Sequence, residues 1–532
     1  MNKQKEFTRR KFLGMSALGT AALLGTSVIG LPGCKKESTT LYGEETEAVV
    51  IGSGFGGAIS SLRLTEKGIK TTLLEMGKQY DINNGQNKVF ASTLQPDTRS
   101  TWMRSESVLP LGPKLRWSGK GPGVLDRVEY ENMKVYRGTC LGGGSVVYGA
   151  MLPQAQEDLF QNLFPNIPYS ELNDKWYPMV RNIIGISTVP QDILDSKYYQ
   201  YARVGLQHAE NAGFGKFFIP GGVNFDIIRQ EIHGTVEKAI TNQDLLYGVN
   251  NGAKNSVDRN YIPAALGTGN LTIQTLTKVE NVTKLDDGRF EVLVTKLDER
   301  GIARSQKTII CKYLFVCAGS VGSNEILVKA RETGNLPDLS LKVGKNWGFN
   351  GNAMAMRKVN QNVGAQQGTV PVTGYVYNDN PLGKTLVEQA PYPIGLELKS
   401  LLGLAVTLNE NKGSFEYDNT LGKAMLKLSA NATEPSIESM RNFLNRVIDA
   451  NGGEIDYKAF KNGISNDFTY HPLGGVVLGE ASDMYGRVNG YKNLYCVDGS
   501  MLPGLCGGVN PALTISALAE RCLDNIVKND FN

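Results

Sequence analysis

The chain has 532 residues, which is enough for two hydrophobic cores or one elaborate core. Hydrophobic residues make up 41% of it and charged residues 20%, values typical of a soluble globular protein. The net charge of +4 is carried entirely by residues 1–33, so the remainder is formally neutral and indicates neither a nucleic-acid partner nor an anionic membrane surface.

Residues 1–33 are predicted to be a twin-arginine signal peptide. Thr8-Arg9-Arg10-Lys11-Phe12-Leu13 resembles that export motif, and an uncharged, moderately apolar run follows it to Gly33. Glycines and Pro32 interrupt the run, so it is a poor permanent membrane span. A signal anchor is the alternative interpretation.

Leu31-Pro-Gly-Cys34 resembles a bacterial lipoprotein box, in which Cys34 would be acylated, and residues 34–45 are predicted to be a polar tether. The twin-arginine route carries folded proteins, which suits a protein that binds a non-covalent cofactor before export. We therefore expect a periplasmic, membrane-anchored or secreted protein whose only membrane contact is a lipid on Cys34.

The other six cysteines form no CxxC pair, so the sequence predicts neither a metal site nor dithiol redox chemistry. Cys311, Cys317 and Cys496 lie in apolar, strand-like runs and are expected to be buried small hydrophobic residues. A disulfide can form in an oxidising compartment, but the sequence does not pair these cysteines.

A strand–turn–helix–strand unit opens the part of the chain that follows. Residues 47–51 are an apolar strand, Gly52-Ser-Gly54-Phe55-Gly56-Gly57 is a glycine turn, residues 58–66 have helical spacing, and residues 70–74 are a second strand that ends at Glu75. This is the arrangement of a dinucleotide-binding fingerprint, with an acidic residue 23 positions after Gly52.

Each part of the fingerprint has a physical role. Gly52 permits the tight turn, Gly54 lets the backbone approach a pyrophosphate, and Gly57 lets helix and strand pack closely. The helix N-terminus offers free N–H groups to the phosphates, and Glu75 can accept hydrogen bonds from ribose hydroxyls. The alternative is a plain glycine turn with a solvated glutamate. A second glycine cluster at residues 138–145 favours a flavin over a nicotinamide cofactor.

The rest of the chain alternates irregular and periodic segments. Residues 78–135 show little periodicity and are expected to cover the site as a loop. Further elements are predicted as helices at 196–212 and 324–331, strands at 271–276, 289–294 and 312–317, and an amphipathic closing helix from Pro511. Because nucleotide-like elements occur at the start, middle and end, we expect two interleaved domains.

A polar cluster precedes that closing helix. His471 stands before Pro472-Leu-Gly-Gly475, Asp498 begins an Asp-Gly-Ser turn, and Asn510 precedes Pro511. Imidazole titrates near neutrality and suits proton transfer during alcohol oxidation. The alternatives are a structural histidine, a turn aspartate and an asparagine helix cap.

With these motifs together, the chain resembles the glucose–methanol–choline (GMC) flavoenzymes, and within them the bacterial cholesterol oxidases with non-covalent FAD. The resemblance runs from about Thr46 to the C-terminus. Its specific pieces are Val124-Leu-Asp-Arg-Val128, Gly142-Gly-Gly-Ser145, Ala264-Ala-Leu-Gly-Thr-Gly269, Gly395-Leu-Glu397, Tyr470-His-Pro-Leu-Gly-Gly475 and Gly486-Arg-Val488.

The resemblance implies an α/β fold, with a Rossmann-like FAD-binding domain interleaved with a substrate domain built on an antiparallel sheet covered by helices. Residues 46–160, 258–340 and 465–532 would form the first domain, and residues 161–257 and 341–464 the second. The implied catalytic residues are His471, Asn510 and Glu397, the last as a proton shuttle whose apolar neighbours favour burial. The FAD would be lined by Phe55, Gly56, Glu75, Gly144, Gly149, Met151, Val279, Asp498 and Gly499.

The implied activity is oxidation of a 3β-hydroxysterol to the 3-ketone, with migration of the Δ5 double bond to Δ4 and reduction of O2 to H2O2. Two residues depart from the family pattern: Tyr148 replaces the usual asparagine after the Gly-Gly-Gly-Ser loop, and Ala512 replaces the usual phenylalanine after Asn-Pro. They keep open a dehydrogenase of another bulky alcohol with a quinone or protein acceptor. A non-catalytic lipid-binding lipoprotein is the third hypothesis, distinguished by the absence of flavin colour.

Overall fold

The computed structural model describes residues 43–531 apart from 84–86, 461 and 466. The predicted signal peptide, Cys34 and most of the predicted tether lie outside the described residues. Glu44 and Glu45, assigned to the tether from sequence, instead begin the first strand. In the described part of the chain, no helix combines the length and the apolar character that crossing a bilayer requires.

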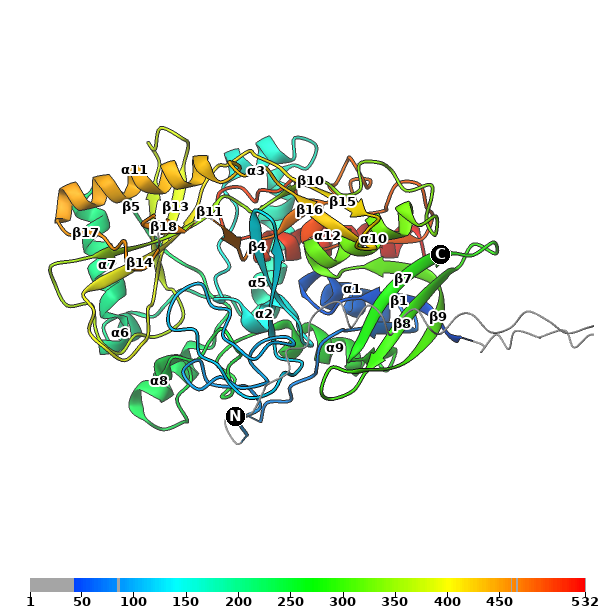
Figure 1. The fold of residues 1–532 in the computed structure, drawn as a ribbon, viewed down its shortest axis with the longest axis horizontal. Helices are drawn as coiled ribbons and strands as arrows, with labels where there is room; N and C mark the ends of the chain where they lie inside the picture. Colours follow the sequence, from blue (N-terminus) through cyan, green and yellow to red (C-terminus); the bar gives the residue numbers. More distant parts are fainter. Residues whose placement is uncertain (1–42, 84–86, 461, 466, 532) are drawn as a thin grey trace, which may run out of the picture. The chain divides into compact units, whose positions relative to one another are not determined.

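A seven-stranded sheet forms the nucleotide-binding layer (Figure 1). Its order is β6-β2-β1-β9-β8-β7, and β21 pairs with β9 outside that path. The strands are β1 (Glu44–Ile51), β2 (Thr71–Leu74), β6 (Leu271–Gln274), β7 (Thr277–Lys284), β8 (Phe290–Leu297), β9 (Ala303–Val316) and β21 (Leu494–Cys496). The carboxyl ends of β1 and β2 lead directly to Gly52 and Glu75, so the parallel part of the sheet sets both ends of the fingerprint.

The long strand β9 has antiparallel pairing in its first part and parallel pairing in its second part. Its first part pairs antiparallel with β8, which pairs antiparallel with β7. Its second part pairs parallel with β1 and β21. The sequence predicted only residues 312–317 of β9 and missed β7, because the polar alternation of Thr277–Lys284 carries no apolar run.

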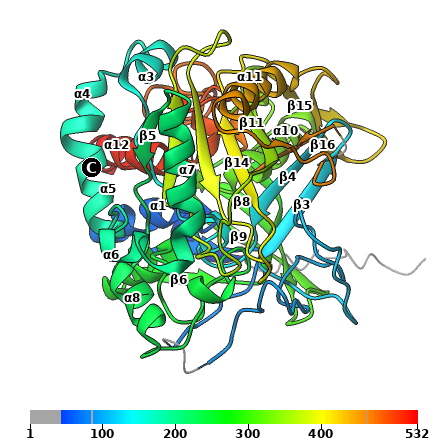
Figure 2. The same cartoon turned by 90° about the vertical axis from the view of Figure 1, so that its left-hand side faces the viewer.

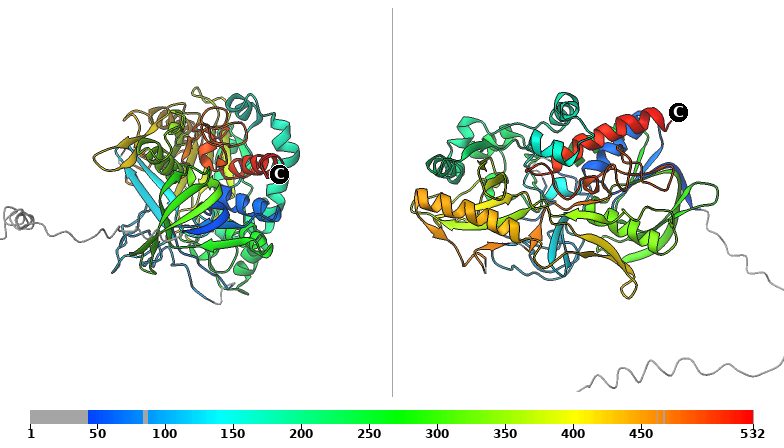
Figure 3. Two further views of the ribbon diagram at one scale, coloured as in Figure 1. Left: turned by 90° about the vertical axis from the view of Figure 1, so that its right-hand side faces the viewer. Right: turned by 90° about the horizontal axis from the view of Figure 1, so that it is seen from above.

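Helices α1 (Phe55–Glu66) and α12 (Ala512–Asn529) pack against each other on the parallel strands, and α9 (Tyr261–Gly267) packs on α1. The right-hand view of Figure 3 shows red α12 above blue α1. Their apolar faces share one core with the central strands, including Ala58, Leu62, Leu513 and Leu518. Helix α10 (Gly319–Glu332) packs on β7.

A buried ion pair joins these helices. The Glu520 carboxylate accepts hydrogen bonds from Arg63 Nε at 2.7 Å and Nη2 at 2.8 Å, and from the Tyr261 hydroxyl at 2.9 Å. The Glu520 side chain is 1% exposed. Glu66, at 47% exposure, contacts Arg63 from the solvent side.

We expect Glu520→Ala to lower the free energy of unfolding by about 3–5 kcal/mol, because it leaves Arg63 and Tyr261 without their buried partner. The matched change Glu66→Ala removes an exposed pair and is expected to cost less than about 1 kcal/mol. Denaturant unfolding of the two variants measures the difference. Equal losses would contradict a special role for the buried pair.

The second large sheet is antiparallel, in the order β17-β11-β14-β13-β12-β5 with β18 paired to β11. Figure 2 shows α7 lying across these yellow strands, and α11 also packs on the sheet. Its strands and covering helices are β5 (Gly215–Phe218), β11 (Asn352–Lys358), β12 (Thr373–Tyr377), β13 (Thr385–Ala390), β14 (Ser400–Val406), β17 (Glu454–Ile455), β18 (Ile464–Ser465), α7 (Gln200–Asn211) and α11 (Glu434–Asn451).

Side chains alternate between the two faces of this sheet. Val387 and Ala405 pack with Phe443 of α11 in one core. Glu388 and Leu404, one position along each strand, line a cavity on the opposite face. The sheet therefore forms one wall of the candidate site.

Smaller elements connect the two sheets. Strands β3 (Leu125–Tyr130) and β4 (Met133–Gly138) form a hairpin that β19 (Phe468–Thr469) extends. Strand β3 and the start of β4 lie inside residues 78–135, the segment predicted to be irregular. The remaining elements are α2 (Gly144–Val147), α3 (Glu157–Leu163), α4 (Tyr169–Glu171), η1 (Leu172–Trp176), α5 (Tyr177–Ile184), α6 (Gln191–Leu194), η2 (Lys197–Tyr199), α8 (Phe225–His233), η3 (Ile240–Asn242), η4 (Val257–Arg259), β10 (Lys345–Gly348), β15 (Ser414–Asp418), β16 (Lys423–Lys427), β20 (Leu473–Gly475) and η5 (Gly499–Met501).

The predicted α/β class with an interleaved antiparallel sheet is confirmed. The exact domain boundaries stay a prediction. All six cysteines among the described residues are buried and free of disulfides, which confirms the expected burial of Cys311, Cys317 and Cys496. In the same part of the chain, no cluster of three His, Cys, Asp or Glu side chains could hold a metal ion.

Candidate active site

One cavity of about 880 Å³ collects almost every residue that the sequence singled out. It is lined by Gly52, Gly54, Phe55, Gly56, Glu75, Gly144, Gly149, Met151, Val279, His471, Asp498, Gly499 and Asn510. Gly57 does not line it, and its role is packing: a Cβ there would lie 1.8 Å from the Gly52 carbonyl oxygen.

The nucleotide end is a backbone cradle. Helix α1 begins at Phe55 with no side-chain cap, so its first N–H groups are free to meet a phosphate. A Cβ placed on Gly54 or Gly144 meets no atom within 4 Å, so both backbones lie open to the cavity. These features fit the pyrophosphate and ring system of FAD.

Glu75 holds this cradle in shape. Its Oε2 accepts from the Ser53 hydroxyl at 2.6 Å and the Ser53 N–H at 3.2 Å, and its Oε1 accepts from the Gly77 N–H at 2.8 Å. Burial raises the pKa of the Glu75 carboxyl, although the hydrogen bonds from Ser53 and Gly77 lower it. Glu75 is predicted to accept hydrogen bonds from ribose hydroxyls. A ribose bound there would therefore share the carboxylate with the glycine turn.

The Asp498 carboxylate also holds two segments of the chain together. Its Oδ2 accepts from the Gly319 N–H at 2.8 Å and the Ser323 hydroxyl at 2.6 Å, both at the start of α10. Its Oδ1 accepts from the Ser500 N–H at 2.7 Å. Asp498 thus connects the N-terminus of α10 to its own Asp-Gly-Ser turn at the cavity wall.

The cradle gives a direct test of cofactor fit. We expect Gly54→Ala to fold normally, because its φ of −66° suits alanine and the Cβ meets nothing, but to bind FAD at least about tenfold more weakly. Gly56→Ala should instead lose folded protein, since its Cβ would lie 1.7 Å from the Val497 carbonyl oxygen. Thermal unfolding of the apoproteins and FAD titration separate the two. Unchanged FAD affinity in Gly54→Ala would show that the cradle lies elsewhere.

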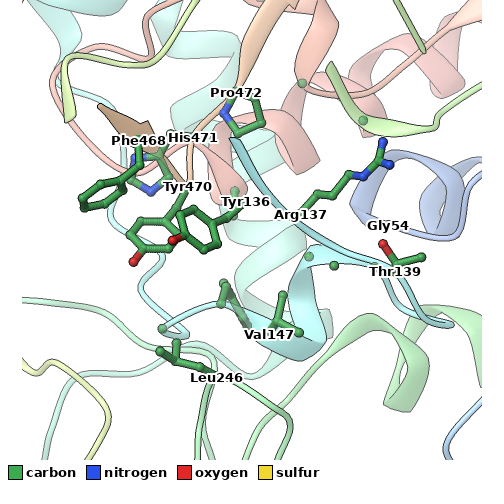
Figure 4. Close-up of a pocket in the computed structure, with 18 of the residues that line it drawn as sticks. Gly54, Tyr136, Arg137, Thr139, Val147, Leu246, Phe468, Tyr470, His471 and Pro472 are labelled. Atoms are coloured by element: carbon green, nitrogen blue, oxygen red, sulfur yellow. The ribbon is translucent and has the colours of Figure 1, made fainter. Parts of the chain in front are cut away.

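At the other end of the cavity, His471 follows β19 and precedes β20. Figure 4 shows its ring beside Tyr470 and Phe468, with Val147 and Leu246 in the lower part of the view. Burial lowers the pKa of His471 to about 4, so the ring is neutral at neutral pH.

Two amides face one nitrogen of this ring. Asn352 Nδ2 lies 2.9 Å and Asn350 Nδ2 lies 3.4 Å from His471 Nδ1. Asn352 is oriented by the Thr469 hydroxyl, which donates to its Oδ1 at 2.7 Å. Both amides donate, so Nδ1 accepts and the proton of the neutral ring is on Nε2.

The Nε2–H group lies beside Asn510, which lines the cavity together with His471. Its neighbour Asn510 Nδ2, at 3.4 Å, is also a donor, so the N–H is available to an oxygen of a bound molecule. The sequence predicted His471 as the proton acceptor. The amides of Asn350 and Asn352 favour the opposite role, a hydrogen-bond donor.

Glu388 on β13 lines the cavity beside Asn510, and sequence reasoning did not single it out. Its side chain is buried and its Oε2 accepts from Asn510 Nδ2 at 3.3 Å. Glu388 Oε1 and Asn510 Oδ1 are buried and make no hydrogen bond within the described part of the chain. Burial raises the pKa of Glu388 to about 8. A buried polar atom without a partner is costly, so these two oxygens indicate a polar ligand.

Glu397 lies outside this cavity. Its carboxylate accepts from the backbone N–H groups of Val363, Gly364 and Lys399, which makes it a brace of the surface loop. The prediction that it joins His471 and Asn510 is therefore wrong in position. The available signal was Glu388 itself, a lone carboxylate in the buried run Thr385–Ala390.

The arm of the cavity beyond these polar groups is apolar. It is lined by Leu109, Leu111, Leu245, Leu246, Leu402 and Leu404. Tyr148 and Ala512 also line the cavity. The Tyr148 ring packs edge-on against Phe55, with 5.8 Å between ring centroids. The arm can hold a large hydrophobic molecule with one polar end at His471, Asn510 and Glu388.

Comparisons with known proteins agree with this architecture. A family model described as GMC oxidoreductase matches residues 48–347, a second of the same description matches 423–519, and one described as GMC oxidoreductase, C-terminal, matches 350–461. A cholesterol oxidase of Mycobacterium tuberculosis is 25% identical over 89% of this chain and 90% of its own. A cholesterol oxidase of Acinetobacter baumannii is 24% identical over 92% and 95%. A solved fungal aryl-alcohol oxidase superposes with a TM-score of 0.63 at 13% identity, covering 92% of this chain and all of that one.

Proposed function

Because this chain belongs to the GMC oxidoreductase family, a flavin-dependent group that acts on alcohols, we propose that it oxidises a 3β-hydroxysterol such as cholesterol. We propose non-covalent FAD as the cofactor and O2 as the electron acceptor, with the 3-ketone and H2O2 as products. The observation that carries the proposal is the buried carboxyl of Glu388 beside Asn510 and His471, at the polar end of an apolar arm.

Three side chains have distinct tasks in this proposal. His471 Nε2–H donates to the substrate oxygen and stabilises the negative charge that develops on it. Glu388 Oε1, when ionised, accepts the hydroxyl proton. Asn510 holds the Glu388 carboxylate at 3.3 Å. When bound, the flavin supplies the hydride acceptor for the carbinol carbon.

The same carboxyl is our candidate for double-bond migration. Glu388 must first release the hydroxyl proton that it accepted. Its carboxylate can then take a proton from one ring carbon of the Δ5 ketone and return it to another, and a buried carboxyl with a raised pKa suits both transfers. We therefore propose that Glu388 has the role first assigned to Glu397. The leucines of the apolar arm would pack against the ring system, while Gln243 and Thr369 are also part of the cavity lining.

A dehydrogenase of another bulky alcohol, passing electrons to a quinone or protein acceptor, is the second candidate. Tyr148 and Ala512 favour it, since both line the cavity and depart from the family pattern. The deciding experiment mixes the anaerobic flavoprotein with cholesterol and with smaller alcohols, follows flavin bleaching, and then compares reoxidation by O2 with reoxidation by a dye. Bleaching by cholesterol with H2O2 release supports the oxidase. No bleaching by any sterol would remove the sterol proposal.

We also propose export by the twin-arginine route and a lipid on Cys34, two predictions that rest on residues outside those described. The buried, unpaired state of the six other cysteines is compatible with folding in a reducing cytoplasm before export. Changing Arg9 and Arg10 together to lysine should retain yellow holoprotein in the cytoplasm. Cys34→Ala should release exported protein from the membrane fraction; continued membrane attachment would argue for a signal anchor.

A further inference from the structure

A buried lysine lies behind the wall of the cavity that would face the flavin. Lys254 is 3% exposed, and its Nζ donates to three backbone carbonyl oxygens: Val146 at 2.7 Å, Tyr148 at 2.9 Å and Leu245 at 2.7 Å. In the described part of the chain it forms no ion pair with a carboxylate. The ammonium therefore has its three N–H donors directed at neutral carbonyl groups.

These carbonyls belong to two different walls. Val146 and Tyr148 flank Val147 at the end of α2, in the segment from which Gly144, Val147, Tyr148 and Gly149 line the cavity. Leu245 lies in the loop that lines the apolar arm. Figure 4 shows Val147 and Leu246, one from each segment, lining the same part of the pocket.

The end of α2 needs such a donor. A four-residue helix satisfies few of its own carbonyls, and a cation at the C-terminal end is favoured by the helix dipole. The next turn of the Lys254 segment adds a second contact, because the Val257 N–H donates to the Ser145 hydroxyl at 3.0 Å. The glycine-rich segment is thus held from behind at both of its ends.

Tyr148, a departure from the family pattern, belongs to the same unit. The Lys254 Nζ lies 5.6 Å from the centroid of its ring, and the same ring packs edge-on against Phe55. The Tyr148 hydroxyl is buried and makes no hydrogen bond among the described residues. Its orientation therefore depends on ring contacts rather than on its polar atom.

We propose that Lys254 is a positioning residue that fixes the flavin-facing segment, including Tyr148, against the loop of the apolar arm. Burial lowers the pKa of Lys254 to about 7, although the nearby charge of Asp258 acts in the opposite direction, so burying the charged lysine disfavours the folded state. The three short hydrogen bonds nevertheless hold two separate cavity walls in one geometry. The inference rests on the flavin site alone and not on the identity of the alcohol.

The test compares Lys254→Met with Lys412→Met in purified holoenzyme. Lys412 is a matched control, because its Nζ is also buried but has no hydrogen-bond partner among the described residues, and it does not line the cavity. We expect Lys254→Met to change the visible circular dichroism of bound FAD and to raise the FAD dissociation constant at least tenfold. Lys412→Met should leave both at the wild-type values.

A merely structural lysine would give a different result. If Lys254→Met lowers the thermal midpoint but leaves the flavin dichroism and FAD affinity unchanged, the positioning role is overturned. If Lys254→Met does not fold, Lys254→Gln keeps two N–H donors on a shorter side chain and is expected to give an intermediate dichroism; a wild-type spectrum there would overturn the proposal. No alcohol enters these measurements, so a wrong substrate assignment cannot produce either outcome.

Discussion

Replacing Glu388 by glutamine is expected to slow alcohol-dependent flavin reduction by about 10²–10⁴-fold and to abolish double-bond migration, while FAD stays bound. The amide fills the same space beside Asn510 but cannot take a proton. Stopped-flow flavin bleaching measures the first step, and absorbance of the conjugated ketone measures the second.

The pH dependence makes this prediction sharper. The pKa of Glu388 is raised to about 8, so below pH 8 most molecules carry the protonated carboxyl and lack the base. Flavin reduction should therefore rise about tenfold per pH unit up to pH 8 and then level off. In Glu388→Gln, the rate of flavin reduction should no longer show this rising limb of the pH profile below pH 8.

The raised pKa also has a consequence for stability. The unfolded carboxyl ionises near its ordinary value while the folded one stays protonated, so stability falls as pH rises from about 4 to 8. Glu388→Gln should remove that decline, which unfolding at several pH values measures.

Glu397→Gln is the matched control for the carboxyl. The amide oxygen can still accept from the loop backbone, so we expect a loss of about 1 kcal/mol in unfolding free energy and unchanged flavin reduction. If Glu397→Gln abolished migration while Glu388→Gln did not, the assignment from sequence would be restored and ours rejected.

His471→Ala is expected to slow flavin reduction by about 10²–10³-fold, because the developing charge on the substrate oxygen loses its N–H donor. The variant should retain the pH limb near 8, since Glu388 is unchanged. Loss of the limb would show that the imidazole, rather than the carboxyl, takes the proton.

His208→Asn provides the comparison for this variant. His208 on α7 is also buried, and burial likewise lowers its pKa to about 4, but its Nδ1 accepts from Nη2 of Arg357 on β11 at 2.6 Å. It does not line the cavity. Its replacement is expected to affect stability and to leave flavin reduction unchanged.

The nucleotide-binding half could be predicted because its constraints are local. The apolar strand, Gly52, Gly54 and Glu75 are close in sequence, and strand, turn and helix follow from periodicity. His471 and Asn510 were found for the same reason, since proline and glycine beside them restrict the backbone. The β3–β4 hairpin was missed because its short strands lack a clear apolar alternation.

A short sequence motif could not show which of two glutamates lies in the cavity. Glu388 and Glu397 are nine positions apart, and only the strand register shows which carboxyl reaches the cavity face. The tautomer of His471 could not be predicted from the sequence either. It depends on Asn350 and Asn352, more than 100 positions earlier, which the antiparallel sheet brings to the ring.

The packing of α12 on α1 has a consequence for how the chain reaches its native state. The Arg63–Glu520 contact closes a span of 457 positions, and β9, one of the parallel neighbours of β1, is likewise remote in sequence. Such non-local topology slows folding and exposes apolar strands until late partners arrive. The nucleotide layer cannot be completed on the ribosome before α12 has emerged, so we expect chaperone dependence during synthesis.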